Sequence, residues 1–162
     1  MTINPTGYLT GGDLEMTRRY KAPVEDVWAS ITEPERTARW FASWRGEGRP
    51  GATVRLALVH EDGQPECDLT IVACEPPHRL EVEVSDEGGH WHMEARLAED
   101  GGVTTLTFVH HLAPETDLTT TGPAWEYYLD RLTAAVTGAP EPDFDDYYPA
   151  QIAHYKALRT TD

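Results

Sequence analysis

The feature of this sequence that most constrains its fold is a strand pattern that leads directly into a helix pattern near the start of the chain. Apolar and polar residues alternate with a period of two from Leu14 to Lys21, which is typical of a β-strand with one buried face. Pro23 then presets the backbone of a first helical turn, where Glu25 and Asp26 suit the positive end of the helix dipole. A strand followed at once by a helix predicts a mixed, α+β domain.

Helical spacing continues beyond Pro23 and returns near the end of the chain. The apolar residues that share one face of the first helix are Val24, Val27, Trp28 and Ile31. A second short helix is predicted from Pro34 to about Phe41. A long amphipathic helix is predicted to end at Gly138, and its apolar face holds Trp125, Tyr128, Leu129, Leu132 and Val136.

Between these helices, residues 43–112 change to the period of strands. Apolar and polar residues alternate within residues 54–58, 80–85 and 91–97, which predicts strands with one wet face. Turn signals separate these runs at residues 61–64, 75–78, 87–89 and 99–102. Because such short connections join antiparallel neighbours, we expect an antiparallel meander of six or seven strands, counting the strand before the first helix.

These patterns divide the chain into three parts. Residues 1–13 hold glycines and a proline but few periodic apolar positions, so we expect a loosely ordered leader. Residues 14–138 form the folded domain. Residues 139–162 are predicted to be a linker rich in proline and acid, followed by a short helix that packs on the domain. That helix could instead cover the opening of any cavity in its own domain, or join a second copy of the chain in a homodimer.

Charge and cysteine content limit the partners and the compartment. The 162 residues include 13 basic and 28 acidic side chains, and the formal net charge of -15 repels nucleic acid and anionic membrane surfaces. We therefore expect neither partner, and the lack of a signal-peptide pattern predicts a cytoplasmic protein. Cys67 and Cys74 lie about 23 Å apart on one predicted strand, well beyond the roughly 7 Å limit of a disulfide.

The order of elements resembles the helix-grip architecture of the START/Bet v1-like (SRPBCC) superfamily, in which a curved antiparallel sheet grips a long C-terminal helix. Within it, four segments are similar to the activator of Hsp90 ATPase homologue-like (AHSA1-like) family. They are the run from Arg18 to Trp28, Glu33-Pro34-Glu35, Ala38-Arg39-Trp40-Phe41, and Gly122-Pro123-Ala124-Trp125. The resemblance covers residues 14–138.

This resemblance implies a cavity between sheet and helix, and there we expect an apolar or aromatic small molecule to bind. It also implies two alternative functions, a polyketide cyclase/aromatase-like enzyme and a module that stimulates an Hsp90-type chaperone ATPase. The sequence holds no nucleophile elbow, phosphate-binding loop or dinucleotide fingerprint, so we expect binding rather than catalysis and name no catalytic residue, metal ligand or cofactor.

The candidate cavity residues are those whose strand or helix spacing turns them toward this space. They are Arg18, Tyr20, Leu56, Leu58, Leu69, Ile71, Val82, Val84, Trp91, Met93, Phe108, His110, Trp125, Tyr128 and Leu129. Three of them are candidate polar contacts: Arg18, His110 and Tyr128. Arg18 interrupts the apolar face of its strand, so it either meets an anionic group of a ligand or pairs with an internal carboxylate. His110 either contacts a ligand or is an ordinary core histidine.

A metal site is the weaker interpretation of the histidines. His90 and His92 are two residues apart on a predicted strand and share a face with Glu94. Two histidines and a carboxylate could ligate a metal ion in principle. That face lies opposite Trp91 and Met93, however, so the pattern favours a solvated surface.

Overall fold

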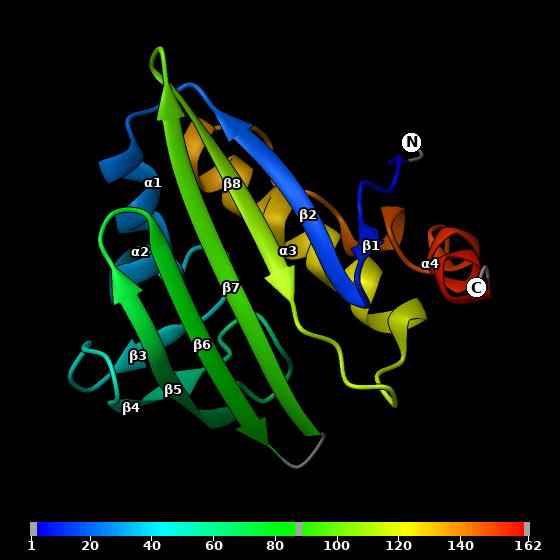
Figure 1. Cartoon of the computed structure of the whole chain (residues 1–162), viewed down its shortest axis with the longest axis horizontal. Coiled ribbons are helices and arrows are strands. Elements are labelled where there is room, and N and C mark those ends of the chain that lie inside the picture. Colours follow the sequence, from blue (N-terminus) through cyan, green and yellow to red (C-terminus); the bar gives the residue numbers. More distant parts are fainter. Residues whose placement is uncertain (1–2, 87–88, 161–162) are drawn as a thin grey trace.

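The computed structural model describes residues 3–86 and 89–160, in which one antiparallel sheet bends around one long helix (Figure 1). Its strands lie in the order β1-β2-β8-β7-β6-β5-β4-β3. The strands are β1 (Tyr8–Thr10), β2 (Asp13–Tyr20), β3 (Ser43–Arg45), β4 (Thr53–Ala57), β5 (Glu66–Glu75), β6 (Arg79–Asp86), β7 (Gly89–Asp100) and β8 (Val103–His110). This arrangement confirms the predicted helix-grip fold class.

The helices differ in length from the sequence prediction more than in position. They are α1 (Val24–Thr32), α2 (Pro34–Thr37), α3 (Leu118–Thr137) and α4 (Ile152–Thr160), with a single 3₁₀ turn η1 (Phe144–Asp146) before α4. α2 ends four residues before Phe41, because the chain turns there to enter β3. Asp117 caps the N-terminus of α3, where its side chain accepts a hydrogen bond from the backbone N–H of Thr119.

The sheet has eight strands rather than six or seven, and one of the additional strands lies in the expected leader. The positive φ angles of Gly11 and Gly12 form a tight turn that folds β1 back onto β2. Within the described part of residues 1–13, a paired strand therefore lies where the sequence analysis expected a loosely ordered leader. Composition alone could not indicate this, because the partner strand and α3 provide the contacts. Residues 1–2, residues 87–88, on which a predicted turn falls, and residues 161–162 lie outside the described residues.

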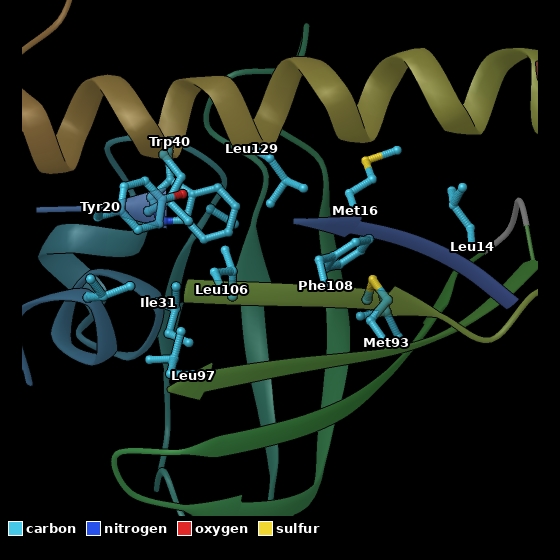
Figure 2. Packing of buried hydrophobic residues seen from close by; sticks show 14 of the residues in the cluster. Leu14, Met16, Tyr20, Ile31, Trp40, Met93, Leu97, Leu106, Phe108 and Leu129 are labelled. Carbon is cyan, nitrogen blue, oxygen red and sulfur yellow. The ribbon is translucent and has the colours of Figure 1, made fainter. Parts of the chain in front are cut away.

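The apolar core lies between α3 and the concave face of the sheet. Figure 2 shows Leu129 pointing down from α3 toward Met16 of β2 and Phe108 of β8. Strand register places Met16 opposite Phe108, and Phe108 opposite Ala95 of β7. Alternation along each strand thus sends one set of side chains into the core and the next set to the outer face. Of the described helices, none combines the length and apolar character that a membrane span requires.

A fully buried aromatic side chain of α4 packs the C-terminal tail on the domain. Tyr155 of α4 is fully buried, and its ring lies against Gly122 of α3 and Gly7 of the N-terminal segment. A Cβ atom at Gly122 would lie 2.4 Å from Cδ1 of Tyr155. The approach of α4 to α3 therefore depends on glycine at this position. The residues that line the cavities described below end at Leu132, so α4 forms no part of their walls.

Substitution of Gly122 by alanine should destabilise the protein, although glycine to alanine inside a helix ordinarily stabilises it by about 1 kcal/mol. The new methyl group would collide with the ring of Tyr155, so we expect a loss of about 1–3 kcal/mol in the free energy of unfolding. Chemical denaturation measures this loss. In a Tyr155→Ala background the same change should regain its ordinary stabilising sign. A gain of stability in the unmodified background would contradict the packing described for α4.

Candidate functional site

Two adjoining cavities lie between the concave face of the sheet and α3. The large cavity has a volume of about 430 Å³ and the small cavity about 250 Å³. Both are lined by Phe41, Leu56, Met93 and Trp125, which form their common wall. The core is thus incompletely filled where a tightly packed protein would be solid.

The cavity walls come from α1, α2, the strands of the sheet and α3. α1 and α2 contribute Trp28, Ile31 and Thr37 to the large cavity. The strands contribute mainly aliphatic side chains, among them Val54, Leu69, Ile71, Val82 and Leu106. α3 contributes Trp125, Leu129 and Leu132. The small cavity is closed by Thr121, Ala124 and Tyr128 of α3 and by Leu58 and Glu61 after β4. Most of the lining is apolar, which suits an apolar ligand.

All five tryptophans of the chain line one cavity or the other. Two of them are held by hydrogen bonds to α1. The indole N–H of Trp40 donates to the carbonyl of Ser30 at 2.8 Å, and that of Trp44 donates to the carbonyl of Thr32 at 2.9 Å. These bonds satisfy the polar edge of each ring and leave its faces for packing. The positions of these two rings are therefore fixed relative to α1.

A second aromatic group, made of Phe41, Trp125, Tyr128 and Phe108, includes the two aromatic residues of the common wall. The ring centroid of Phe41 lies 5.8 Å from that of Trp125 and 5.4 Å from that of Tyr128. The ring centroid of Trp125 also lies 4.4 Å from that of Phe108 on β8. Such spacings are favourable for aromatic pairs. A ligand that spans both cavities would pass beside this cluster.

Most of the predicted site residues do line these cavities. They are Leu56, Leu58, Leu69, Ile71, Val82, Val84, Trp91, Met93, Phe108, Trp125, Tyr128 and Leu129. Sequence reasoning missed Trp28, Trp40, Phe41 and Trp44, which come from helices, a turn and a short strand. The enrichment of the chain in tryptophan was a signal for them, but strand periodicity could not place residues outside regular strands.

Arg18, Tyr20 and His110 are the predicted residues that line neither cavity. The guanidinium of Arg18 donates to Glu126 at 3.0 Å and to Asp130 at 2.9 Å, both on α3. Arg18 thus meets internal carboxylates, one of the two alternatives that the sequence left open. Tyr20 is a core side chain with 1 % of its surface exposed.

His110 is a buried polar group next to the cavity wall. Its side chain has no exposed surface, and neither ring nitrogen has a hydrogen-bond partner among the described residues. It lies opposite Met93 in the sheet, and its ring centroid is 6.3 Å from that of Trp125. Desolvation by burial lowers the pKa of His110 to about 4. The ring is therefore neutral at pH 7 and can both donate and accept a hydrogen bond.

The strand face that carries His92 and Glu94, for which the sequence favoured a solvated surface over a metal site, carries a network of ion pairs. Nε2 of His92 lies 2.5 Å from Oε2 of Glu81, while Glu94 accepts hydrogen bonds from Arg96 at 2.8 Å and pairs with His111 at 3.2 Å. Glu94 is buried rather than solvated, because these neighbours cover it. Within residues 3–86 and 89–160, no group of three histidine, cysteine or acidic residues has the geometry to hold a metal ion.

The small cavity has one polar feature, a tyrosine paired with a carboxylate. The hydroxyl of Tyr128 donates to Oε2 of Glu61 at 3.4 Å. Burial, together with the charge of Glu61, raises the pKa of Tyr128 to about 12. Tyr128 therefore remains protonated at neutral pH, and Glu61 retains lone pairs for further hydrogen bonds.

Comparisons with known proteins agree with this architecture. A family model described as "Activator of Hsp90 ATPase homolog 1-like protein" matches residues 21–137. No curated protein matches the chain. The crystal structure of CalU16 from Micromonospora echinospora is 29% identical with a TM-score of 0.73, and the alignment covers 96% of this chain and 95% of CalU16. The solution structure of CalU16 is 27% identical with a TM-score of 0.74, covering 99% of both chains.

A more distant structural match shows the fold alone. DynU16, described as belonging to the dynemicin biosynthetic locus, is 23% identical with a TM-score of 0.69. The alignment covers 83% of this chain and 51% of DynU16.

Proposed function

This chain belongs to the family of activator of Hsp90 ATPase homolog 1-like proteins, and from that premise we propose that it binds an apolar or aromatic small molecule in its two adjoining cavities. The fold of this family leaves space for a small molecule between sheet and helix. The observation that carries the proposal is a large cavity walled by aromatic and aliphatic side chains.

The size and lining of the cavity support binding. A volume of about 430 Å³ falls within the range of roughly 300–1,000 Å³ that is typical of small-molecule sites. A ligand that covers these apolar walls removes them from water, which contributes about 25 cal/mol for each Å² of apolar surface buried.

The two alternative functions, a polyketide cyclase-like enzyme and a module that stimulates a chaperone ATPase, stay predictions from the resemblance. The cavity favours binding over the chaperone-linked module, because docking on another protein requires an outer surface rather than a hollow interior. It favours binding over the enzyme because its lining is dominated by apolar side chains, whereas proton transfer needs a positioned polar group.

Titration with a neutral fluorescent probe, N-phenyl-1-naphthylamine, tests the proposal. Because all five tryptophans line the cavities, the bound probe should quench their emission while its own emission rises. We expect a Kd on the order of micromolar. Substitution of Val82 by tryptophan, at the centre of the concave face, should fill the large cavity and weaken binding by about tenfold or more, a loss of at least about 1.4 kcal/mol.

Val72 provides the matched control. It lies on β5 next to Ile71 but on the opposite face of the sheet, where 42% of its surface is exposed. Val72→Trp adds the same ring outside the cavity and should leave the Kd unchanged. Failure of the unmodified protein to bind the probe, or equal affinity in the Val82→Trp variant, would overturn the proposal.

A further inference from the structure

The charges around the cavities restrict the ligand further, and this inference rests on the proposed function. We propose that the cavities select neutral or cationic aromatic molecules that carry an N–H or O–H donor, and that they reject aromatic anions of the same shape. The donor of the ligand would lie at the end of the small cavity, where it meets the carboxylate of Glu61.

The first support is the sign of the charged lining residues. Across both cavities the charged residues of the described lining are Glu33, Glu61 and Glu94, and lysine, arginine and histidine do not occur in that lining. The side chain of Glu94 lies on the outer face of β7 with Arg96 and His111, so Glu33 and Glu61 are the carboxylates that bear on a ligand. Two of these carboxylates already have basic partners. Glu94 pairs with Arg96 at 2.8 Å, and Glu33 lies 3.8 Å from Arg36.

Glu61 differs from the other two carboxylates. Among the described residues, the side-chain partner recorded for it is the hydroxyl of Tyr128, which is a neutral donor. One weak hydrogen bond leaves most of the acceptor capacity of a carboxylate unused. A ligand N–H or O–H group that reaches this point would form a charge-assisted hydrogen bond, which is stronger than a bond between neutral groups.

A buried arginine on α3 cannot serve an anionic ligand instead. Arg131 is buried on α3, and its guanidinium donates to the carbonyls of Trp40 and Arg39, to the hydroxyl of Tyr127 and to the ring of His60. The N–H donors of its guanidinium are therefore already hydrogen-bonded within the protein. If Arg131 turned toward a ligand, these hydrogen bonds would break and leave buried polar groups without partners.

An anion in these cavities would thus lose its hydration without gaining a counter-ion. Burying an unpaired charge is costly, and the carboxylate of Glu61, which is exposed at the cavity end, adds a repulsion that solvent partly screens. A neutral molecule does not meet this penalty, and a cation gains attraction. The same walls therefore discriminate between ligands by charge while they accept the same aromatic shape.

Two probes of matched shape test this selectivity. N-phenyl-1-naphthylamine is neutral, whereas 8-anilinonaphthalene-1-sulfonate has the same ring system with an added sulfonate. We expect the sulfonate to raise the Kd by about tenfold or more. If the neutral probe fails to bind, the proposed function is wrong. If both probes bind equally well, only the charge selectivity is wrong.

A substitution locates the origin of the discrimination. Glu61→Gln keeps the shape of the side chain and removes its charge, so the ratio of the two Kd values should fall by about threefold or more. Glu115→Gln removes the same unit of charge at an exposed position outside both linings and should leave the ratio unchanged. An equal response to both substitutions would attribute the effect to the overall charge of the protein and overturn the role of Glu61.

Discussion

Replacing Glu126 by alanine is expected to lower the free energy of unfolding by about 3–5 kcal/mol, the range measured when one member of a buried ion pair is removed. Glu126 has 1 % of its surface exposed, on the side of α3 that faces β2 and the chain termini. Its carboxylate accepts hydrogen bonds from Arg18 at 3.0 Å and from the hydroxyl of Tyr155 at 2.5 Å. The variant would leave the buried charge of Arg18 with Asp130 alone.

The same carboxylate also holds the N-terminal segment. Its oxygens accept from the backbone N–H and the hydroxyl of Thr6, each at 2.5 Å, and from the N–H of Gly7 at 3.3 Å. Loss of Glu126 should therefore loosen both ends of the chain. Hydrogen exchange at Thr6 and along α4 should rise more than exchange in the central strands.

Chemical denaturation of three variants tests this explanation. Glu126→Ala should be strongly destabilised, whereas Glu115→Ala, at an exposed position, should change stability by less than about 0.5 kcal/mol. The double substitution Arg18→Met/Glu126→Leu removes both charges and should recover much of the loss. A mild effect of Glu126→Ala would show that the network contributes little. No recovery in the double variant would show that the unpaired charge of Arg18 is not the main cause of the loss.

Substitution of His110 by leucine is expected to stabilise the protein and to flatten its response to acid. The unpartnered ring nitrogens cost about 1–3 kcal/mol in the native state, and leucine avoids this cost at similar volume. The pKa of His110 falls from the ordinary 6.5 to about 4 on folding, so the unfolded chain binds the proton more tightly. The free energy of unfolding is therefore not reduced by protonation of His110 above pH 6.5, and it declines as the pH drops from 6.5 toward 4.

Denaturant titrations between pH 7 and pH 4 measure this effect. A shift from 6.5 to about 4 corresponds to a loss of about 3 kcal/mol over that interval in the unmodified protein. His110→Leu should lose correspondingly less over the same interval, while substitution of the exposed His90 by leucine should retain the original decline. Parallel pH profiles for all three proteins would contradict a neutral, buried His110.

Under the proposed function, His110 is a candidate ligand contact, because its unpartnered ring lies beside Met93 and Trp125 of the cavity wall. We therefore expect His110→Leu to weaken binding of ligands with a hydroxyl or carbonyl group more than binding of a pure hydrocarbon. Competition against N-phenyl-1-naphthylamine would separate the two classes.

The local sequence determined the elements and the directions in which most side chains point. Strand alternation placed Leu56, Val82 and Met93 on the concave face, and helical spacing placed Trp125 and Leu129 on the inner face of α3. These assignments depend only on backbone geometry with periods of 2 and 3.6 residues, which a short window of sequence contains. The fold class follows from the order of such windows.

Only the tertiary structure determined which residues that are distant in the sequence contact each other. Arg18 lies 108 residues from Glu126, Tyr155 inserts between Gly7 and Gly122, and Glu61 meets Tyr128 across 67 residues. Periodicity carries no information about such distant partners, and it cannot show whether facing side chains fill the space between them. The cavities exist because the bent sheet and α3 lie too far apart for their side chains to fill the space between them. The aromatic wall and the carboxylate at the cavity end depend on the same separation, which is a property of the assembled packing.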